Sequence, residues 1–171
     1  MKTVTLNTAT KWVLDKAFSP VVIVTTFDTM NNRPTGMTAG WSIPCSTEPL
    51  MYSVALWKKG YTHTLLQESS SFAINIPNKA LLKTVKIFGS KHGDKLAKFD
   101  LAKVKYELWG EKKVPILSEA SAIYICEKKD VVDCGDHFIF IGKVVESFVD
   151  PKRKTLINTG KHGRKREFIE V

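Results

Sequence analysis

The chain has 171 residues, of which 43% are hydrophobic and 25% charged, and its formal net charge is +9. This length and composition predict one domain over residues 1–171 with a well-buried core, and they exclude a disordered or low-complexity chain. No run approaches the roughly 18 apolar residues of a membrane span, and residues 1–19 lack the apolar core of an export signal, so we expect a cytoplasmic protein with no membrane partner.

Strand patterns and turn signals alternate along the first third of the chain. Residues 11–18 have the spacing of a short helix that Pro20 would end. The β-branched run 21–27 predicts a buried strand. A second strand is expected over 35–42 and a third over 51–57, with a turn rich in proline and serine between them.

Two short helices are expected between the next strands. Residues 62–68 have a helix start signal and apolar spacing, and 72–76 alternate as a fourth strand. Asn78 can cap a second helix whose apolar residues share one face and which Gly89 would end.

The second half of the chain returns to strands. Residues 90–99 are polar, and 101–117 contain at most short strands. A fifth strand is expected over 122–127, a turn over 133–136, and the longest strand over 137–149. Many strands with a few short helices predict a mainly β fold, a small β-barrel with Greek-key-like connections, in preference to a parallel α/β sheet.

The expected second strand is unusually poor in side chains. Gly36, Ala39 and Gly40 leave its backbone bare, and a glycine weakens a strand unless a bend or a closely approaching group uses the missing side chain. Two interpretations stay open on these residues, a tight bend in a barrel and a flat ligand that lies against the backbone.

A basic turn follows the third strand. Lys58, Lys59, Thr62 and Thr64 lie between that strand and a helix start, where free backbone N–H groups, ammonium groups and hydroxyls suit a phosphate. A solvated turn is the alternative. The polar segment 89–95 is a second candidate of the same kind.

The net charge is concentrated at one end. Residues 151–171 hold seven of the 26 Lys and Arg residues and two of the 17 acidic ones. Such a basic C-terminal segment is typical of a solvated end. Nucleic-acid binding is not expected, because the chain lacks a helix-turn-helix pattern, an aromatic RNP-like strand and zinc ligands.

Cysteine and histidine chemistry has little support. The three cysteines lie in or beside apolar strands, where inert buried thiols are usual. The four histidines lie in separate segments without metal-ligand spacing, so no metal site is expected. These residues are Cys45, Cys126 and Cys134, and His63, His92, His137 and His162.

Six segments, taken in order, resemble the flavin reductase-like, FMN-binding split-barrel family, which includes flavoredoxins and the reductase components of two-component monooxygenases. The resemblance runs from about Ser19 to Val149. The segments are 19–26, 36–41 with Ser46 and Pro49 after it, 61–66, 72–77, 89–99 and 134–142.

The resemblance implies an FMN-binding homodimer whose flavin sites lie close to the subunit interface. Its activity would be that of an NAD(P)H:flavin reductase, which passes hydride from a nicotinamide to flavin. Such a transfer needs alignment and exclusion of water more than an acid or a base. The nearest alternative is a flavoredoxin-like electron-transfer protein that holds FMN tightly and serves a redox partner protein. A non-catalytic flavin-binding protein is the other.

The resemblance also assigns residues to parts of the cofactor. Those lining the flavin ring are Met37, Thr38, Ala39 and Gly40, with Trp41 beside them. Those beside the ribityl chain are Ser46 and Thr47. Those holding the phosphate are Lys58, Lys59, Thr62 and His63, with His92, Gly93 and Lys95. His137 would lie at the ring face where a nicotinamide stacks.

Two departures from the family pattern stand out. Relatives commonly have Ser-Gly-Arg-Asp where this chain has His92–Lys95, which removes a guanidinium from the expected phosphate site; Lys91 or Lys95 would replace it only as a point charge. Relatives also often carry an aromatic side chain in the glycine-rich C-terminal segment, which residues 159–166 lack. The choice between NADH and NADPH, and between FMN as prosthetic group and as substrate, stays open.

Overall fold

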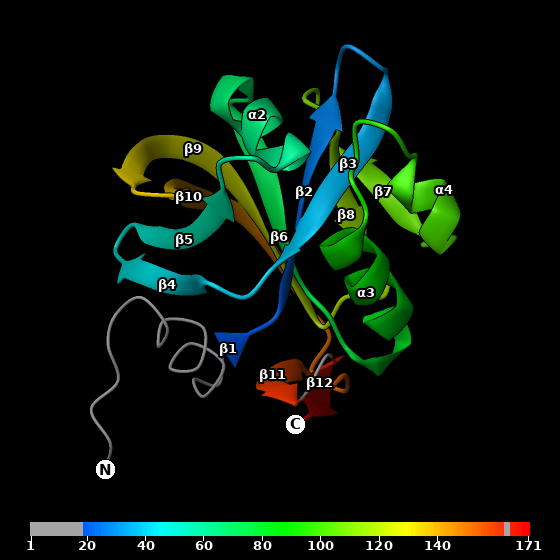
Figure 1. Cartoon of the computed structure of the whole chain (residues 1–171). Helices are drawn as coiled ribbons and strands as arrows, with labels where there is room; N and C mark the ends of the chain where they lie inside the picture. Colours follow the sequence, from blue (N-terminus) through cyan, green and yellow to red (C-terminus); the bar gives the residue numbers. More distant parts are fainter. Residues whose placement is uncertain (1–18, 163–164) are drawn as a thin grey trace, which may run out of the picture.

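A computed structural model describes residues 19–162 and 165–171, with side chains for 19–160 and 166–171. The helix expected over 11–18 lies outside these residues. Figure 1 shows strands gathered around a central sheet, with short helices at its top and right. The elements are β1 (Ser19–Pro20), β2 (Val22–Asp28), β3 (Arg33–Ala39), β4 (Ser42–Thr47), β5 (Leu50–Trp57), α2 (Tyr61–Glu68), β6 (Ser71–Ile76), the 3-10 helix η1 (Lys79–Leu81), α3 (Leu82–Ser90), α4 (Lys98–Ala102), β7 (Tyr106–Trp109), β8 (Val114–Leu117), β9 (Ala122–Cys134), β10 (His137–Val149), β11 (Leu156–His162) and β12 (Lys165–Glu170).

Seven strands form one antiparallel sheet in the order β3-β2-β6-β9-β10-β5-β4. Two bulges interrupt the β9–β10 ladder, after Ile141 and after Val144. Gly142 lies at the first of them, and a Cβ there would lie 2.7 Å from the Phe72 ring. The bulges increase the bend of the two long strands, which curve over β5 in Figure 1. The mainly β prediction is confirmed.

Strand β2 is buried on both faces, as its unbroken apolar run predicts. Ile23 packs with α3, α4 and β8 on one side. Val22 and Val24 point to the other side, into the core that Phe72 and Phe140 fill. The sheet therefore has a core on each face. Helices α3 and α4 cover the first core, and α2 packs into the second through Leu66.

Several boundaries differ from the predicted ones. The strand expected over 35–42 is broken after Ala39, and β4 begins at Ser42, because the bare backbone at Gly40 allows the chain to change partner from β2 to β5. Strand β9 continues to Cys134, so the turn expected over 133–136 is reduced to Gly135 and Asp136, with Gly135 at φ 70°.

The cap of the second helical segment is confirmed, since the Asn78 side chain accepts hydrogen bonds from the N–H groups of Ala80 and Leu81. Helix α3 itself runs one residue past Gly89. The expectation of buried thiols holds only for Cys126, because Cys45 and Cys134 are exposed on edge and turn positions.

The basic C-terminal segment is not a solvated end. Strands β11 and β12 form a three-stranded sheet with β1, which lies beneath the main sheet in Figure 1. Leu156 and Asn158 are buried in it. The apolar residues between the cations supply this strand pattern, which the charge count had obscured.

Candidate functional site

Three segments that the sequence assigned to the cofactor meet over strand β3. Gly60, in the turn before α2, faces Met37, because a Cβ added to Gly60 would lie 3.7 Å from the Met37 Sδ. Gly93, in the loop after α3, touches both elements, because a Cβ there would lie 3.0 Å from the Thr35 Oγ1 and 3.2 Å from the Tyr61 Cδ1. The fold therefore brings the turn at 58–62 and the loop at 91–95 together over β3.

The two lysines of the turn lie over aromatic rings. Lys58 Nζ is 2.6 Å from Asp133 Oδ1 and 4.5 Å from the centroid of the Phe138 ring. Lys59 Nζ is 5.8 Å from the centroid of the Trp57 ring. Both ammonium groups reach solvent and are placed to meet an anion beside the β9–β10 turn.

Thr62 and His63, in contrast, are buried in the first turn of α2. The His63 ring stacks on Phe138, with centroids 5.3 Å apart and 3° between the planes, and neither ring nitrogen has a hydrogen-bond partner of good geometry. Burial, followed by the nearby Lys58 ammonium, lowers the pKa of His63. The His63 ring is therefore neutral at pH 7, and it would attract a phosphate less strongly than the charged Lys58 ammonium does.

His137 opens strand β10 opposite the end of β5, where it is paired with Trp57. Its Nδ1 lies 2.7 Å from Asp136 Oδ1, and this hydrogen bond lowers the pKa of the Asp136 carboxyl. The Trp41 ring also lies against the imidazole, with ring centroids 4.6 Å apart. The imidazole is therefore fixed by two neighbours at the edge of the site.

The ring-lining candidates divide into buried and open ones. The Ala39 methyl is part of the core with Val22 and Tyr52. Thr38 donates a hydrogen bond to the Val85 carbonyl in α3, at 2.7 Å. Gly40 and Trp41 lie at the break between β3 and β4, outside this packing. A flat ring would thus meet backbone at 39–40 and the exposed indole.

Ser46 and Thr47 are not brought to these loops within one chain. They end strand β4 and pair with Met51 and Leu50 at the start of β5, whereas Lys58 follows the far end of β5. The two groups are therefore separated by the length of a strand.

His92 and Lys95 are exposed in the loop after α3, and the backbone of this loop is held by a residue that the sequence gave no reason to select. Arg33 Nη2 donates to the Gly93 carbonyl at 2.8 Å and to the Asp94 carbonyl at 3.2 Å. Its Nε lies 3.7 Å from the fully buried carboxylate of Asp28.

Asp28 is the centre of a polar network beneath the loop. It accepts hydrogen bonds from the Tyr61 hydroxyl at 2.6 Å and from the Asn31 side chain at 2.8 Å. Burial alone raises the pKa of Asp28, but these bonds and the Arg33 guanidinium outweigh it and hold the pKa below its ordinary value. The carboxylate stays charged and keeps Arg33 in place.

A buried lysine lies under the same loop. Lys98 Nζ donates to the Gly36 carbonyl at 3.0 Å and to the Phe88 carbonyl at 3.1 Å. Burial lowers the pKa of Lys98 to about 8. Sequence reasoning missed Lys98 because a lysine before an apolar residue at a helix start is an ordinary surface pattern.

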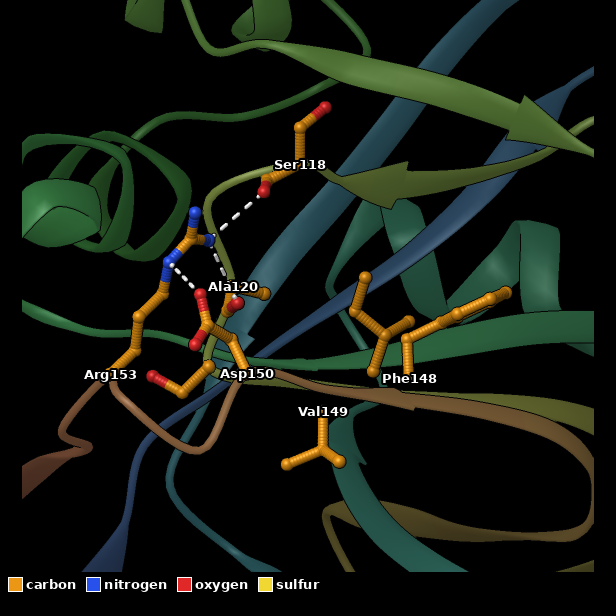
Figure 2. A pocket seen from close by; sticks show the side chains of 8 residues that line it. Ser118, Ala120, Phe148, Val149, Asp150 and Arg153 are labelled. Carbon is orange, nitrogen blue, oxygen red and sulfur yellow. Dashed lines mark hydrogen bonds and ion pairs between the residues drawn. The ribbon is translucent and has the colours of Figure 1, made fainter.

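A separate hollow of about 170 Å³ lies at the other end of β10. Figure 2 shows the Arg153 guanidinium directed at the carbonyls of Ser118 and Ala120, to which it donates at 3.0 and 3.1 Å, with its Nε 2.9 Å from Asp150 Oδ2. The Arg153 guanidinium is thus bound by two carbonyl groups and one carboxylate of the protein. None of the predicted cofactor residues lines this hollow.

Two features are absent from residues 19–162 and 165–171, the part of the chain that the structure describes. No group of three or more His, Cys, Asp or Glu side chains is placed to hold a metal ion there. No helix in these residues combines the length and apolar character needed to cross a bilayer.

Comparison with known proteins relates most of the chain, including all the candidate site residues, to one family. A family model described as a flavin reductase-like domain matches residues 14–165. An uncharacterized protein of Archaeoglobus fulgidus is 33% identical over 66% of this chain and 64% of its own length. One of Pyrococcus abyssi is 34% identical over 78% of this chain and 80% of its own. The chain thus spans slightly under two thirds of the first relative and more of the second.

Relatives with a described activity are more distant. An NADH:riboflavin 5′-phosphate oxidoreductase of Streptomyces pristinaespiralis is 29% identical over 81% of this chain and 76% of its own. Among solved structures, an NADH:FAD oxidoreductase of Streptomyces globisporus, in complex with NAD and FAD fragments, superposes with a TM-score of 0.81 at 23% identity, over 92% of each chain. A flavoredoxin of Methanosarcina acetivorans gives 0.81 at 18% identity, over 100% of this chain and 92% of its own. These structures share the fold.

Proposed function

Because the chain belongs to the flavin reductase-like domain family, we propose that it binds FMN and passes hydride to it from NADH or NADPH. The observation that carries the proposal is the meeting of the Lys58 turn, the 91–95 loop and strand β3 at one place, beside His137. The relative described as an NADH:riboflavin 5′-phosphate oxidoreductase acts on the same pair of molecules.

The residues present fit a flavin mononucleotide. Among the described residues, an added Cβ at Gly40 would lie 3.2 Å from Ser19 Oγ and 3.9 Å from the Pro20 carbonyl, so protein occupies that side. Gly40 is half-buried, and a flat ring would meet its backbone from the side away from Ser19. Lys58, Lys59 and Lys95 bring positive charge to one end of the site, where a phosphate would be held. Bound FMN would supply the hydride-accepting ring.

His137 and Trp41 serve the nicotinamide side in this proposal. The Asp136 carboxylate fixes the orientation of the imidazole, and the indole shields it from water. A nicotinamide aligned on this edge would react with little help from an acid or a base, since alignment and a dry site supply most of the acceleration in hydride transfer.

The same proposal includes a homodimer in the reducing cytoplasm. Large apolar side chains are exposed at Trp41, just before β4, and on the adjacent strands β4, β5 and β10, where a second copy would cover them. They are Trp41, Ile43, Leu50, Trp57, Val145, Phe148 and Val149. The three free cysteines agree with a reducing compartment. Sedimentation of the wild type and of Ile43→Lys tests the dimer, because a charge buried in the interface would yield monomers.

The first experiment is an absorbance spectrum of the purified protein after addition of FMN, and then of NADH or NADPH without oxygen. Uptake of the flavin followed by bleaching of its absorbance band is the expected result. Flavin that binds and stays oxidised would favour an electron carrier reduced by a protein partner, as in flavoredoxin. Absence of flavin uptake would overturn the proposal.

A further inference from the structure

Arg33, the first residue of β3, grips two consecutive carbonyl groups of the loop after α3. Its Nη2 donates to the oxygens of Gly93 and Asp94, at 2.8 and 3.2 Å. The contact joins residues 60 positions apart in the chain. A single guanidinium therefore determines which way this stretch of backbone faces.

The direction of those carbonyls fixes the direction of two N–H groups. In a planar trans peptide, the C=O of one residue and the N–H of the next point in opposite directions. In the described residues the only cis peptide joins Glu48 to Pro49, so both loop peptides are trans. With the carbonyls of Gly93 and Asp94 turned toward Arg33, the N–H groups of Asp94 and Lys95 are turned away from it.

These two N–H groups have no hydrogen-bond partner among the residues that the structure describes. Consecutive N–H groups that face the same way form a concave site for an anion. The exposed side chains of His92 and Lys95 lie beside them and add charge or hydrogen-bond donors.

We propose that Arg33 is the positioning residue for the phosphate of the flavin, holding the Gly93 and Asp94 carbonyls inward so that the Asp94 and Lys95 N–H groups face the phosphate. The inference rests on the proposed FMN binding. It also explains how this chain can do without an arginine inside the loop, since the guanidinium arrives from β3 and acts on the backbone.

Arg33 is itself held from below. Its Nε faces Asp28 Oδ2 at 3.7 Å, and this carboxylate is fixed by Tyr61 at 2.6 Å and by Asn31 at 2.8 Å. Asp28 is fully buried, so the anchor is shielded from salt and solvent. Tyr61 opens α2, which links the position of the loop to that of the Lys58 turn.

The test compares FMN with riboflavin, which lacks the phosphate, by titration calorimetry on Arg33→Met, Arg33→Lys and wild type. We expect Arg33→Met to raise the Kd of FMN about tenfold or more, because charge-assisted bonds to two N–H groups are lost, and to change the Kd of riboflavin less than twofold. Arg166→Met, at an exposed arginine of β12, is the matched control and should change neither Kd.

Arg33→Lys separates positioning from simple charge. One ammonium lacks the planar fork of the guanidinium, so we expect it to restore less than half of the lost preference for FMN. Full restoration would show that Arg33 acts only as a charge and would overturn the inference. Equal losses for both flavins, or no loss, would overturn it as well. A wild type that binds neither flavin would instead overturn the proposed function, and the inference with it.

Discussion

The Trp41 indole lies against the His137 imidazole, with centroids 4.6 Å apart and 39° between the ring planes. Trp41 immediately precedes β4 and His137 is the first residue of β10, and β5 lies between these two strands in the sheet. The contact closes the edge of the site at the point where the ladder between β5 and β10 begins. It holds the His137 ring in place at the edge of the candidate site.

Replacing His137 with alanine should therefore affect the nicotinamide step more than flavin binding. We expect His137→Ala to slow the reduction of bound FMN by NADH about 10- to 100-fold, since misplaced reactants lose rates of this order, and to change the Kd of FMN less than threefold. Stopped-flow absorbance and a flavin titration measure the two quantities. A large rise in the Kd with an unchanged rate would place His137 at the phosphate instead.

Lys58 is held by Asp133, and this pair allows a sharper test than removal of the lysine alone. Lys58→Ala should weaken FMN by about three- to tenfold and leave riboflavin unchanged, because only FMN carries the phosphate. Asp133→Asn frees the same ammonium and should strengthen FMN slightly. Fluorescence quenching of both flavins provides the comparison, and equal effects on the two would remove Lys58 from the phosphate site.

The fold was predictable where the signal is local. The apolar run of β2 and the alternation of β6 and β10 mark those strands, and Asn78 marks the start of a helical segment. Strand patterns do not show where the chain changes partner. For that reason the break after Ala39 and the β1–β11 pairing were missed.

The site was predictable only in part, for a similar reason. Glycines and lysines in turns can be found from the sequence, but the residues that hold those turns in place lie far away along the chain. Asp28 and Arg33 reach the 91–95 loop through contacts that only the folded chain creates. The sequence left open that Gly36 makes room for a ligand, but the structure gives it a packing role. A Cβ there would lie 2.4 Å from the Val24 carbonyl and 3.2 Å from the Phe88 ring. Protein, not a ligand, fills that space.

Gly36→Ala should consequently destabilise the fold. The added methyl would push against the backbone of β2 and against Phe88, and overpacking of this kind costs about 1–3 kcal/mol. Urea unfolding measures the loss. Gly89→Ala is a suitable control, because among the described residues its Cβ would contact Thr38 alone, at an ordinary 3.5 Å, and alanine favours the helix. An unchanged midpoint for Gly36→Ala would show that β2 and β3 can move apart freely.

Lys98 predicts a pH dependence of stability. Burial lowers its pKa in the folded protein to about 8, from an ordinary value of 10.5. Between these two values the unfolded chain binds more protons than the folded one, so stability rises with pH over this range and is constant on either side as far as Lys98 is concerned. The neutral amine keeps two N–H donors, enough for the carbonyls of Gly36 and Phe88.

The measurement is the free energy of unfolding from pH 7 to pH 10.5 for wild type and Lys98→Met. We expect the wild type to gain about 3 kcal/mol relative to the variant as the pH rises from 8 to 10.5, because each unit of pKa shift corresponds to about 1.4 kcal/mol. Lys86→Met, at an exposed lysine of α3, should follow the wild type throughout. Parallel curves for wild type and Lys98→Met would mean that the ammonium is stabilised by the two carbonyls as strongly as it is by water.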